Sequence, residues 1–387
     1  MQVKYSVIMG AVAAFMAVSV PMSAQAQDMV VKIGHVGPTS GGIAHLGKDN
    51  ENGARMAIDE LNAKGVTIGG KKVKFELLAE DDGADPKQGT AAAQKLVDSK
   101  VNGVVGHLNS GTSIPASKIY SDAGIPQVSP SATAVAYTNR GLKTTFRVVA
   151  NDGQLGGTLG RYAITDLKAK SIAVIDDRTA YGQGVADEFE KGVKSKGGAI
   201  VDRQFTNDKA TDFTAILTAI KAKKPDVIFF GGMDAVAGPM LRQMKQLGIT
   251  AKMMGGDGIC SGELPKLAAG SMADGQVICA EAGGIDSKDA AAMKGMEDFR
   301  AKFKAKFKAD VQIYSPYVYD SVNLLVDAMV KAGSSDPAKY LPVLAKTANY
   351  KGVTGLISFD PKGDIQNGAL TLHSYAGDKQ TNIGVVR

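Results

Sequence analysis

The chain has 387 residues, a formal net charge of +6 and 44% hydrophobic residues, enough to build more than one buried core. A chain of this length normally divides into two domains. Its basic residues are spread along the chain without a nucleic-acid-binding motif, which argues against nucleic acid as a partner. Four scattered histidines and two cysteines argue against a zinc site, and we expect neither a metal nor a cofactor.

The first 26 residues are typical of a cleavable secretory signal. Lys4 supplies the positive charge, residues 7–20 form an apolar run, and Ala24-Gln25-Ala26 is a small-residue cleavage site. The apolar run is too short for a transmembrane helix. No cysteine lies near the cleavage site to carry a lipid anchor. We therefore expect residues 1–26 to be removed and the mature chain to reside in a Gram-negative periplasm.

Strand and helix patterns alternate after this segment, which indicates mostly parallel sheets covered by helices on both faces. The first series has predicted strands at 30–36, 73–79, 101–105 and 124–128, and predicted helices at 47–63 and 87–98. Asp85-Pro86 is typical of an N-cap followed by a proline in the first helical turn. The second series has predicted strands at 171–175, 199–205, 227–230 and 252–254, and predicted helices at 153–166, 181–196, 212–223 and 234–246.

The last part of the chain differs from both series. It has predicted helices near 287–308, 315–332 and 336–347, then strands near 354–359 and 370–375. Long helices after the second series indicate that the chain returns to the first lobe. We expect lobe 1 to hold residues 27–150 and 282–356, and lobe 2 to hold residues 151–281 and 357–387, with a cleft between them.

Small hydroxyl residues follow two neighbouring strands of the first series. They are the segment Asn109-Ser110-Gly111-Thr112-Ser113 and the segment Ser129-Pro130-Ser131-Ala132-Thr133. Open α/β sheets bind ligands at the carboxyl ends of their strands. A helix starting near Gly111 would direct free N–H groups there, and Ser110 and Thr133 would add hydroxyl donors. This combination suits a carboxylate, although the same residues also serve as ordinary helix caps.

Two residues of the second series would complete such a site. Asp257 follows a strand, and across the cleft its carboxylate would bind an ammonium group, because a buried charge needs a partner. Tyr181 would form a cleft wall. The plainer interpretations are a surface turn for Asp257 and a helix start for Tyr181.

The cysteines, Cys260 and Cys279, enclose a loop that a disulfide would close. In an oxidising compartment two such residues usually pair, which stabilises the fold by about 3 kcal/mol in the loop-entropy model. Two buried free thiols are the alternative.

Four other patterns carry weaker signals. The glycines of segment 34–42 lack dinucleotide-loop spacing, and the acidic segment 80–85 lacks the spacing of a calcium loop, so we interpret them as a tight loop and a capped turn. His107 and Ser110 lack the G-x-S-x-G context of a hydrolase. Phe299, Phe303 and Phe307 lie among basic residues, which predicts an amphipathic helix with a solvated outer face, or else a docking face for a permease or membrane.

Taken in order, these segments resemble the periplasmic branched-chain amino-acid-binding family, which includes leucine/isoleucine/valine-binding proteins. The resemblance covers nearly all of the mature chain. It rests on residues 33–41, 81–88, 106–117, 129–133, 177–184, 229–232 and 355–360. It implies two Rossmann-like lobes joined by a three-strand hinge, the type I periplasmic-binding fold. It further implies a monomer that performs no chemistry and delivers an L-amino acid to an inner-membrane ABC permease after its lobes close.

The resemblance also assigns roles to particular residues. Ser110 and Thr133 would hold the ligand carboxylate with help from the backbone of Ser131 and Ala132, Asp257 would meet the ammonium, and Tyr181 would close over the ligand. The full set of candidate ligand-binding residues is Leu46, Asn109, Ser110, Ser131, Ala132, Thr133, Tyr181, Met233 and Asp257.

This sequence departs from well-known members of the family at several of these positions. Leu46 and Met233 stand where those members carry aromatics, and Asp257 stands where glutamate is common. Ala84 and Asn109 replace a cystine found in some members. The side-chain pocket is therefore reshaped, and an aromatic acid, an amide or urea is an alternative ligand. A sensor subunit is an alternative role, and a secreted hydrolase is a remote one.

Overall fold

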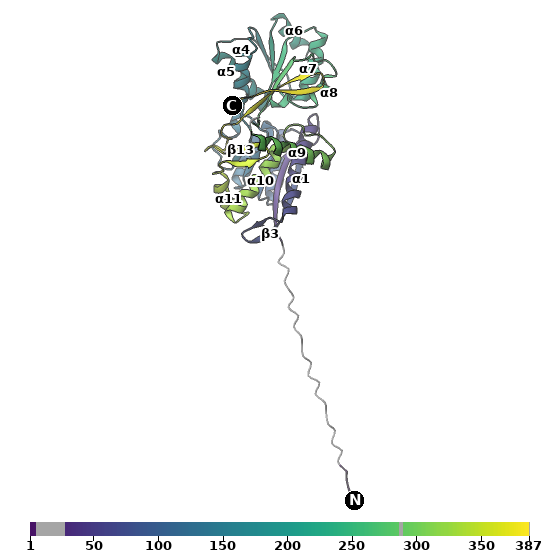
Figure 1. Cartoon of the computed structure of the whole chain (residues 1–387), viewed down its shortest axis with the longest axis vertical. Helices are drawn as coiled ribbons and strands as arrows, with labels where there is room; N and C mark the ends of the chain where they lie inside the picture. The colour runs from purple at the N-terminus through teal and green to yellow at the C-terminus, as the bar shows by residue number, and fades with distance from the viewer. Residues whose placement is uncertain (5–27, 286–288, 387) are drawn as a thin grey trace.

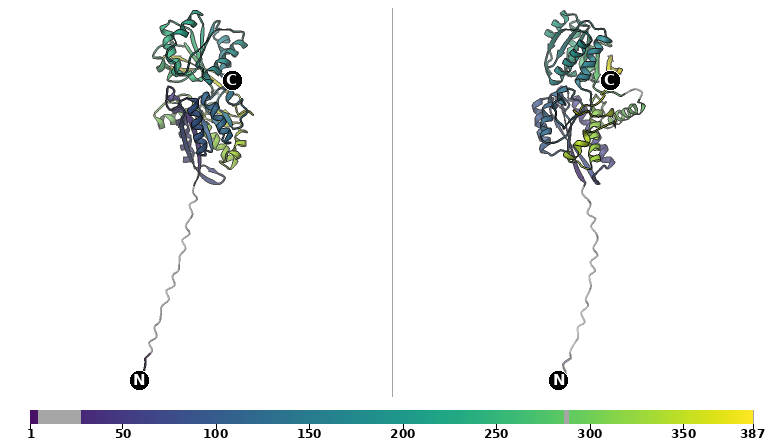
Figure 2. Two further views of the ribbon diagram at one scale, coloured as in Figure 1. Left: turned by 180° about the vertical axis from the view of Figure 1, so that it is seen from behind. Right: turned by 90° about the vertical axis from the view of Figure 1, so that its left-hand side faces the viewer.

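The structure is a computed structural model that describes residues 1–4, 28–285 and 289–386, so the predicted signal sequence lies largely outside the described residues. Two α/β lobes are stacked end to end, with helices α4 to α8 in one lobe and α1 and α9 to α11 in the other (Figure 1). The rear and side views in Figure 2 show the same division. This confirms the predicted α/β fold class.

The sheet of the first lobe has the strand order β2-β3-β1-β4-β5-β6. Its strands are β1 (Met29–Gly37), β2 (Thr67–Ile68), β3 (Lys71–Asp81), β4 (Gly103–Gly106), β5 (Gln127–Ser129) and β6 (Thr145–Arg147). All pairs are parallel except β2 with β3. The sequence analysis missed β2 and β6, which are only two and three residues long.

The sheet of the second lobe has the strand order β15-β14-β11-β10-β9-β7-β8. Its strands are β7 (Ile172–Asp176), β8 (Ile200–Phe205), β9 (Val227–Gly231), β10 (Lys252–Gly255), β11 (Val277–Glu281), β14 (Leu370–Ala376) and β15 (Lys379–Val386). The sequence analysis missed β11 and β15. The pairs of β14 with β11 and β15 are antiparallel, so this sheet is mixed at one edge.

Helices cover these sheets largely as predicted. They are α1 (Ala44–Lys64), α2 (Pro86–Asp98), α3 (Ser110–Asp122), α4 (Asp152–Thr165), α5 (Ala180–Ser195), α6 (Thr214–Ala222), α7 (Asp234–Gln246), α8 (Leu264–Ala268), α9 (Ala290–Phe307), α10 (Ser315–Ala332) and α11 (Pro337–Leu344). The last three lie in the first lobe (Figure 1). The segment predicted as a strand at 354–359 instead contributes to a small hairpin, β12 (Tyr350–Gly352) with β13 (Gly355–Ile357), outside both main sheets.

Local sequence explains the central elements. Strands β4, β7 and β9 are buried at every residue, as expected for parallel strands covered on both faces. Asp85 caps α2 by accepting N–H groups of Lys87 and Gln88, with Pro86 in the first turn, as predicted. Helices α4 and α5 approach closely because glycine lines their contact: a Cβ on Gly160 would lie 2.2 Å from the carbonyl oxygen of Phe189.

Within residues 28–386, apart from the undescribed 286–288, three chain segments cross between the lobes, and together they form the hinge. They follow β6, β11 and β13, and the backbone N–H of Ala150 in the first crossing donates to the carbonyl of Ala282 in the second, at 2.9 Å. Phe359 still packs against Phe146 of the first lobe, with the two rings tilted by 39°, and Asp364 still pairs with Arg147. The third crossing therefore lies beyond the predicted boundary at residue 356.

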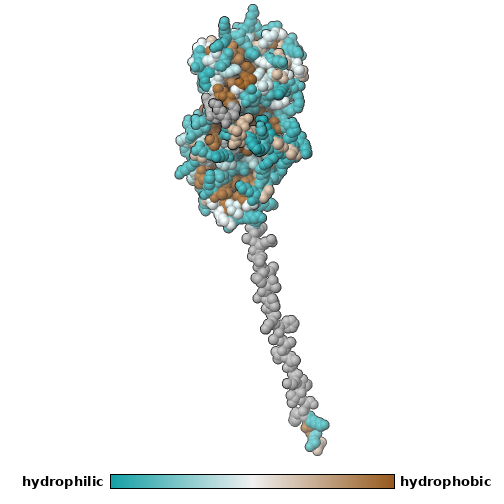
Figure 3. All heavy atoms as spheres, in the orientation of Figure 1, coloured by the Kyte–Doolittle hydropathy of each residue, from teal (hydrophilic) through white to brown (hydrophobic). Residues whose placement is uncertain are grey.

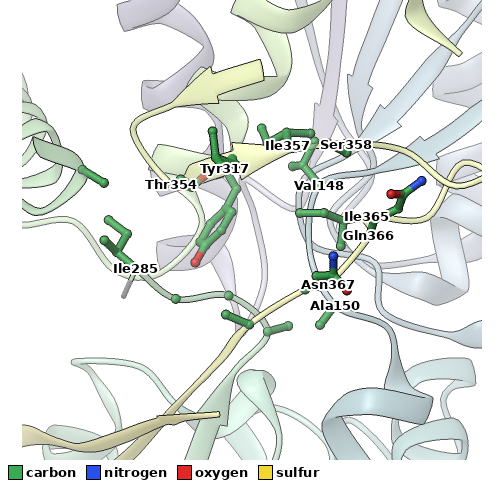
Figure 4. A pocket seen from close by; sticks show the side chains of 18 of the residues that line it. Val148, Ala150, Ile285, Tyr317, Thr354, Ile357, Ser358, Ile365, Gln366 and Asn367 are labelled. Carbon is green, nitrogen blue, oxygen red and sulfur yellow. The ribbon is translucent and has the colours of Figure 1, made fainter. Parts of the chain in front are cut away.

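A cavity of about 550 Å³ lies against this hinge. Figure 4 shows that segments far apart in the sequence surround it, with Val148 and Ala150 on the first crossing, and Ile357, Ser358 and Ile365 to Asn367 at and after the end of β13. The Tyr317 side chain also reaches its wall. The residues that line it are mainly small, apolar or amide-bearing, and acidic and basic side chains of the described residues do not face each other across it.

The predicted basic helix is α9. Phe299 and Phe303 are buried, while Lys302 and Lys306 on its outer side pair with Glu60 and Asp59 of α1. The first lobe therefore neutralises part of the basic face itself, which favours the solvated-face interpretation. Hydrophilic residues cover most of the molecular face in Figure 3. No helix within the described part of the chain is long and apolar enough to cross a membrane.

Cys260 and Cys279 form a disulfide that ties the segment after β10 to β11. Both residues are fully buried, so the bond is shielded from solvent reductants. We expect peptide mapping of the protein purified without reductant to recover the two cysteines in one cross-linked peptide. We also expect Cys279→Ser to lower the free energy of unfolding by about 2–5 kcal/mol. Recovery of both residues as free thiols would rule out the pairing.

Candidate ligand-binding site

A small cavity lies where the lobes meet, and residues from both lobes line it. Its volume is about 10 Å³, room for about one water molecule. The lining residues are Leu108, Asn109, Ser110, Ser131 and Tyr314 from the first lobe, and Tyr181, Met233 and Asp257 from the second. The structure thus brings six of the predicted residues together: Asn109, Ser110, Ser131, Tyr181, Met233 and Asp257. The lobes are closed on each other in this form.

The first-lobe side of the cavity is rich in hydrogen-bond donors. Helix α3 begins at Ser110, and no side chain caps its N-terminus. The Ser110 hydroxyl accepts the N–H of Ala134 at 3.1 Å, so its own proton is free to donate. The Thr133 hydroxyl is buried close to the Asp152 carboxyl, and Thr133 is not among the residues that line the cavity. An uncapped helix start beside the Ser110 hydroxyl suits an anion.

The loop that carries Thr133 is held rigidly from behind. The Ser129 hydroxyl accepts the N–H groups of Ala132 at 2.9 Å and Ser131 at 3.4 Å, so these two groups serve the loop rather than the cavity. The fully buried Arg147 donates to the carbonyls of Ala132 and Ala134 at 3.0 and 2.9 Å. Ala132 therefore lies behind the site and does not line the cavity.

Asp257 provides negative charge from the second lobe. It begins a short 3₁₀ turn directly after β10, and its side chain is buried. The Tyr314 hydroxyl donates to its Oδ2 at 3.0 Å, whereas Oδ1 has no partner among the described residues. Burial raises the pKa of Asp257 to about 6, against hydrogen bonds from the Tyr181 and Tyr314 hydroxyls that lower it. The free Oδ1 therefore needs a cationic or donor partner.

Asp152 is a second buried carboxyl at this place, and the sequence analysis missed it. It is the first residue of α4, its side chain is fully buried, and it lines neither the small cavity nor the wider cleft. Burial raises the pKa of Asp152 to about 8, a hydrogen bond with the Thr133 hydroxyl acts to lower it, and the negative charge of Asp257 acts to raise it. Its backbone N–H donates to the carbonyl of Thr133 at 2.8 Å. One feature could have pointed to Asp152: because the Asn151 side chain caps α4, the Asp152 carboxyl is not needed as the helix cap.

Tyr181 and Met233 form the wall between this cavity and a wider one. The backbone N–H of Gly258 donates to the Tyr181 hydroxyl at 3.0 Å. A Cβ on Gly258 would lie 2.8 Å from both the Met233 sulfur and the Tyr181 ring, so glycine is required for their approach. The wider cleft, about 560 Å³, shares Asn109, Tyr181 and Met233 with the small cavity. Leu46 is fully buried in the core and lines neither space.

The alternative motifs have structural explanations. Asp81 accepts the N–H groups of Thr39 and Gly83, and Asp85 caps α2, so the acidic segment is a capped turn as interpreted. No group of residues suited to hold a metal ion occurs in the parts of the chain that the structure describes. His107 faces Asp82 at 3.1 Å and Tyr120 at 3.0 Å, which commits both ring nitrogens away from Ser110.

Two α/β lobes, three crossings and an interlobe site define the type I periplasmic-binding fold. The family model described as "Periplasmic binding protein" matches residues 30–375, and the chain belongs to this family. Its members bind ligands and are not enzymes. The chain is a substrate-binding protein of the kind that ABC transporters use.

Several known proteins are similar to this chain along most of its length. A Leu/Ile/Val-binding protein homolog of Brucella abortus is 36% identical over 337 residues, 87% of each chain. A leucine-, isoleucine-, valine-, threonine- and alanine-binding protein of Pseudomonas aeruginosa is 34% identical over 349 residues, 90% of each chain.

Solved structures show the same fold. A branched-chain amino acid transporter substrate-binding protein from Streptococcus pneumoniae, in complex with isoleucine, has a TM-score of 0.81 at 28% identity, covering 92% of this chain and 98% of that one. A solute-binding protein from Rhodopseudomonas palustris, in complex with 3,4-dihydroxybenzoic acid, has a TM-score of 0.79 at 23% identity, covering 92% and 97%. The latter likeness concerns the fold alone.

Proposed function

We propose that this chain is the periplasmic substrate-binding component of an ABC importer and binds an aliphatic, branched-chain L-amino acid between its lobes. Ser110, Thr133 and the start of α3 hold the α-carboxylate. Asp257 and Asp152 hold the α-ammonium, and Tyr181 and Met233 border the side chain. The loaded, closed form then docks as a monomer on the inner-membrane permease.

One observation carries the proposal: unpartnered donors and acceptors of opposite charge preference meet in one buried place. Oδ1 of Asp257 has no partner among the described residues, and the buried Asp152 carboxyl has none besides the nearby Thr133 hydroxyl. Buried polar groups are normally hydrogen-bonded. An α-amino acid would supply partners for these buried groups, because its carboxylate and its ammonium both form charge-assisted hydrogen bonds.

The wider cleft supports an aliphatic side chain. The small cavity has room for about one water molecule, so the rest of a ligand extends past Met233 into the wider cleft. The lining of that cleft includes the apolar Ile43, Pro86 and Ala235 and also the charged Arg178, Asp208 and Lys209. The names of the Brucella and Pseudomonas relatives and the isoleucine complex favour the same ligand class.

An aromatic acid is the second candidate, because a structure with the same fold binds 3,4-dihydroxybenzoic acid. Such a ligand brings no cation. It would leave Asp257 and Asp152 buried without a partner, which costs about 1–3 kcal/mol for each unsatisfied group and more if it is charged. The two acidic residues therefore favour an amino acid.

We expect leucine, isoleucine or valine at millimolar concentration to raise the melting temperature of the mature protein. At 100 times Kd a ligand stabilises the folded state by roughly 2.7 kcal/mol. Calorimetry then measures the affinity directly, because the chain has no tryptophan whose fluorescence could report binding.

The control ligand is 4-methyl-2-oxopentanoate, which keeps leucine's carboxylate and side chain but lacks the ammonium. We expect it to bind far more weakly than leucine. Binding of benzoate derivatives without binding of any aliphatic amino acid would contradict the proposal and favour the aromatic-acid candidate.

A further inference from the structure

A second polar contact bridges the lobes beside the ligand site. His45 lies in the first turn of α1 in the first lobe, and its Nε2 is 2.7 Å from Oδ2 of Asp234, the first residue of α7 in the second lobe. The His45 side chain is 24% exposed, whereas the Asp234 side chain is fully buried. The contact therefore joins a partly exposed histidine of the first lobe to a buried carboxylate of the second lobe.

The acceptor is built without His45. The Ser261 hydroxyl, also from the second lobe, donates to the same Oδ2 of Asp234. When the lobes separate, Asp234 keeps Ser261 and loses only His45, which returns to water. The Gly42 loop beside His45 also meets the second lobe, since a Cβ on Gly42 would lie 3.6 Å from the Cβ of Ala235. His45 thus changes its surroundings when the lobes open and close.

We propose that His45 is a positioning residue that latches the closed form through Asp234, and that it does so most strongly as the imidazolium. It does not touch the ligand. The latch rests on the proposed function only in one respect: a ligand bound between the lobes is held more tightly when the latch stabilises the closed form.

The charges around His45 favour a proton in the closed form. Asp234 of α7, Glu263 before α8 and Asp49 of α1 all act to raise the pKa of His45, and together they outweigh burial, which lowers it. Glu263 is partly offset by its own pair with Lys266 at 2.7 Å. In the open form His45 loses Asp234, and its pKa returns toward the ordinary value near 6.5.

The direction of the pH effect follows from these two states. The closed form binds the proton more tightly than the open form, so the latch is fully present below about pH 6.5 and weakens as pH rises through the raised pKa of His45. Closure, and any ligand binding that requires it, therefore takes up a proton in this window. For a single titrating group, the ligand affinity changes by at most about tenfold per pH unit.

The cavity carboxyls act in the opposite direction. A bound ammonium favours the ionised forms of Asp257 and Asp152, so these groups release protons on binding. The latch is therefore measured as the difference between the wild-type protein and His45→Gln, in which both carboxyls are unchanged.

The test is calorimetry with leucine at pH 6, 7.5 and 9, in pairs of buffers with different ionisation enthalpies. We expect His45→Gln to weaken binding about 3- to 30-fold at pH 6 and several-fold less at pH 9, and to take up fewer protons than wild type at pH 7.5. Asp234→Asn is the partner variant, and the double variant should be no weaker than the worse single variant. Equal pH profiles and equal proton uptake in wild type and His45→Gln would overturn the latch.

A ligand-free arm separates this proposal from the proposed function. Small-angle scattering of the empty protein should give a smaller radius of gyration at pH 6 than at pH 9 for wild type, and no such change for His45→Gln. If no amino acid binds, the proposed function fails, and the scattering result alone decides the latch. Identical radii for wild type at both pH values would then overturn it.

Discussion

Asp257→Asn is expected to weaken leucine binding by about 2–5 kcal/mol, the cost of removing one partner of a buried, hydrogen-bonded charge pair. This corresponds to a loss of roughly 30-fold to several thousand-fold in affinity. The substitution keeps the side-chain shape and the acceptor for Tyr314 while removing the charge that meets the ammonium. Calorimetry at pH 7.5 measures the effect.

The empty protein should respond in the opposite direction. Burial raises the pKa of Asp257 to about 6, so its ionised form is disfavoured in the folded state. Asp257→Asn is therefore expected to leave the free energy of unfolding unchanged or to raise it by about 1–3 kcal/mol at neutral pH. A control for burial alone is Asp320→Asn, since Asp320 is equally buried but accepts from Val353 and Thr354, away from the cavity. Unchanged affinity in Asp257→Asn, or equal losses in both variants, would show that Asp257 lies outside the site.

Asp152→Asn is expected to weaken binding to a similar extent and also to change the pH dependence of stability. The folded, empty protein holds a proton on Asp152 up to about pH 8, whereas the unfolded chain releases it near pH 4. Between these values the folded state binds more protons, so stability falls as pH rises, by up to about 1.4 kcal/mol per pH unit. The variant should flatten this slope.

Urea unfolding at pH 6.5 and pH 8 checks the prediction, with and without leucine. Saturating leucine should flatten the slope in wild type as well, because its ammonium stabilises the ionised carboxyl. A wild-type slope that persists unchanged in Asp152→Asn would place the buried proton elsewhere.

Much of this architecture was readable from the sequence because parallel, doubly covered strands are continuous apolar runs. Strands β4, β7 and β9 follow that rule at every position. Two of the missed strands had weaker patterns. β6 spans only three residues, and β15 is an edge strand with no fully buried residue, so neither shows the hydrophobic run or alternation that identifies a strand. By contrast, β11 is a buried apolar run that follows the same rule, and the sequence analysis overlooked it.

The sequence pointed to Ser110 and Asp257 because polar residues that follow strand ends stand out, and the structure places both at one cavity. Asp152 and Tyr314 were not proposed from the sequence for a physical reason. Each sits at the start of a helix, where polar residues are ordinary, and only the three-dimensional structure reveals that the Asp152 carboxyl is fully buried and that Tyr314 reaches Asp257. Leu46 was proposed as a cleft residue, but its side chain points into the core of the first lobe. Its neighbour His45 is the residue that contacts the other lobe.

The proposed ligand contacts lie on different lobes, which implies an order of binding events. Ser110 and Thr133 belong to the first lobe, whereas Tyr181 and Asp257 belong to the second, and Asp152 begins α4 directly after the first crossing, where its backbone N–H donates to the carbonyl of Thr133. Under the proposed function, we expect a ligand to meet the first-lobe residues on the open protein and the second-lobe residues only on closure. The first-lobe residues would then govern the rate of ligand capture, and the second-lobe residues the rate of its release.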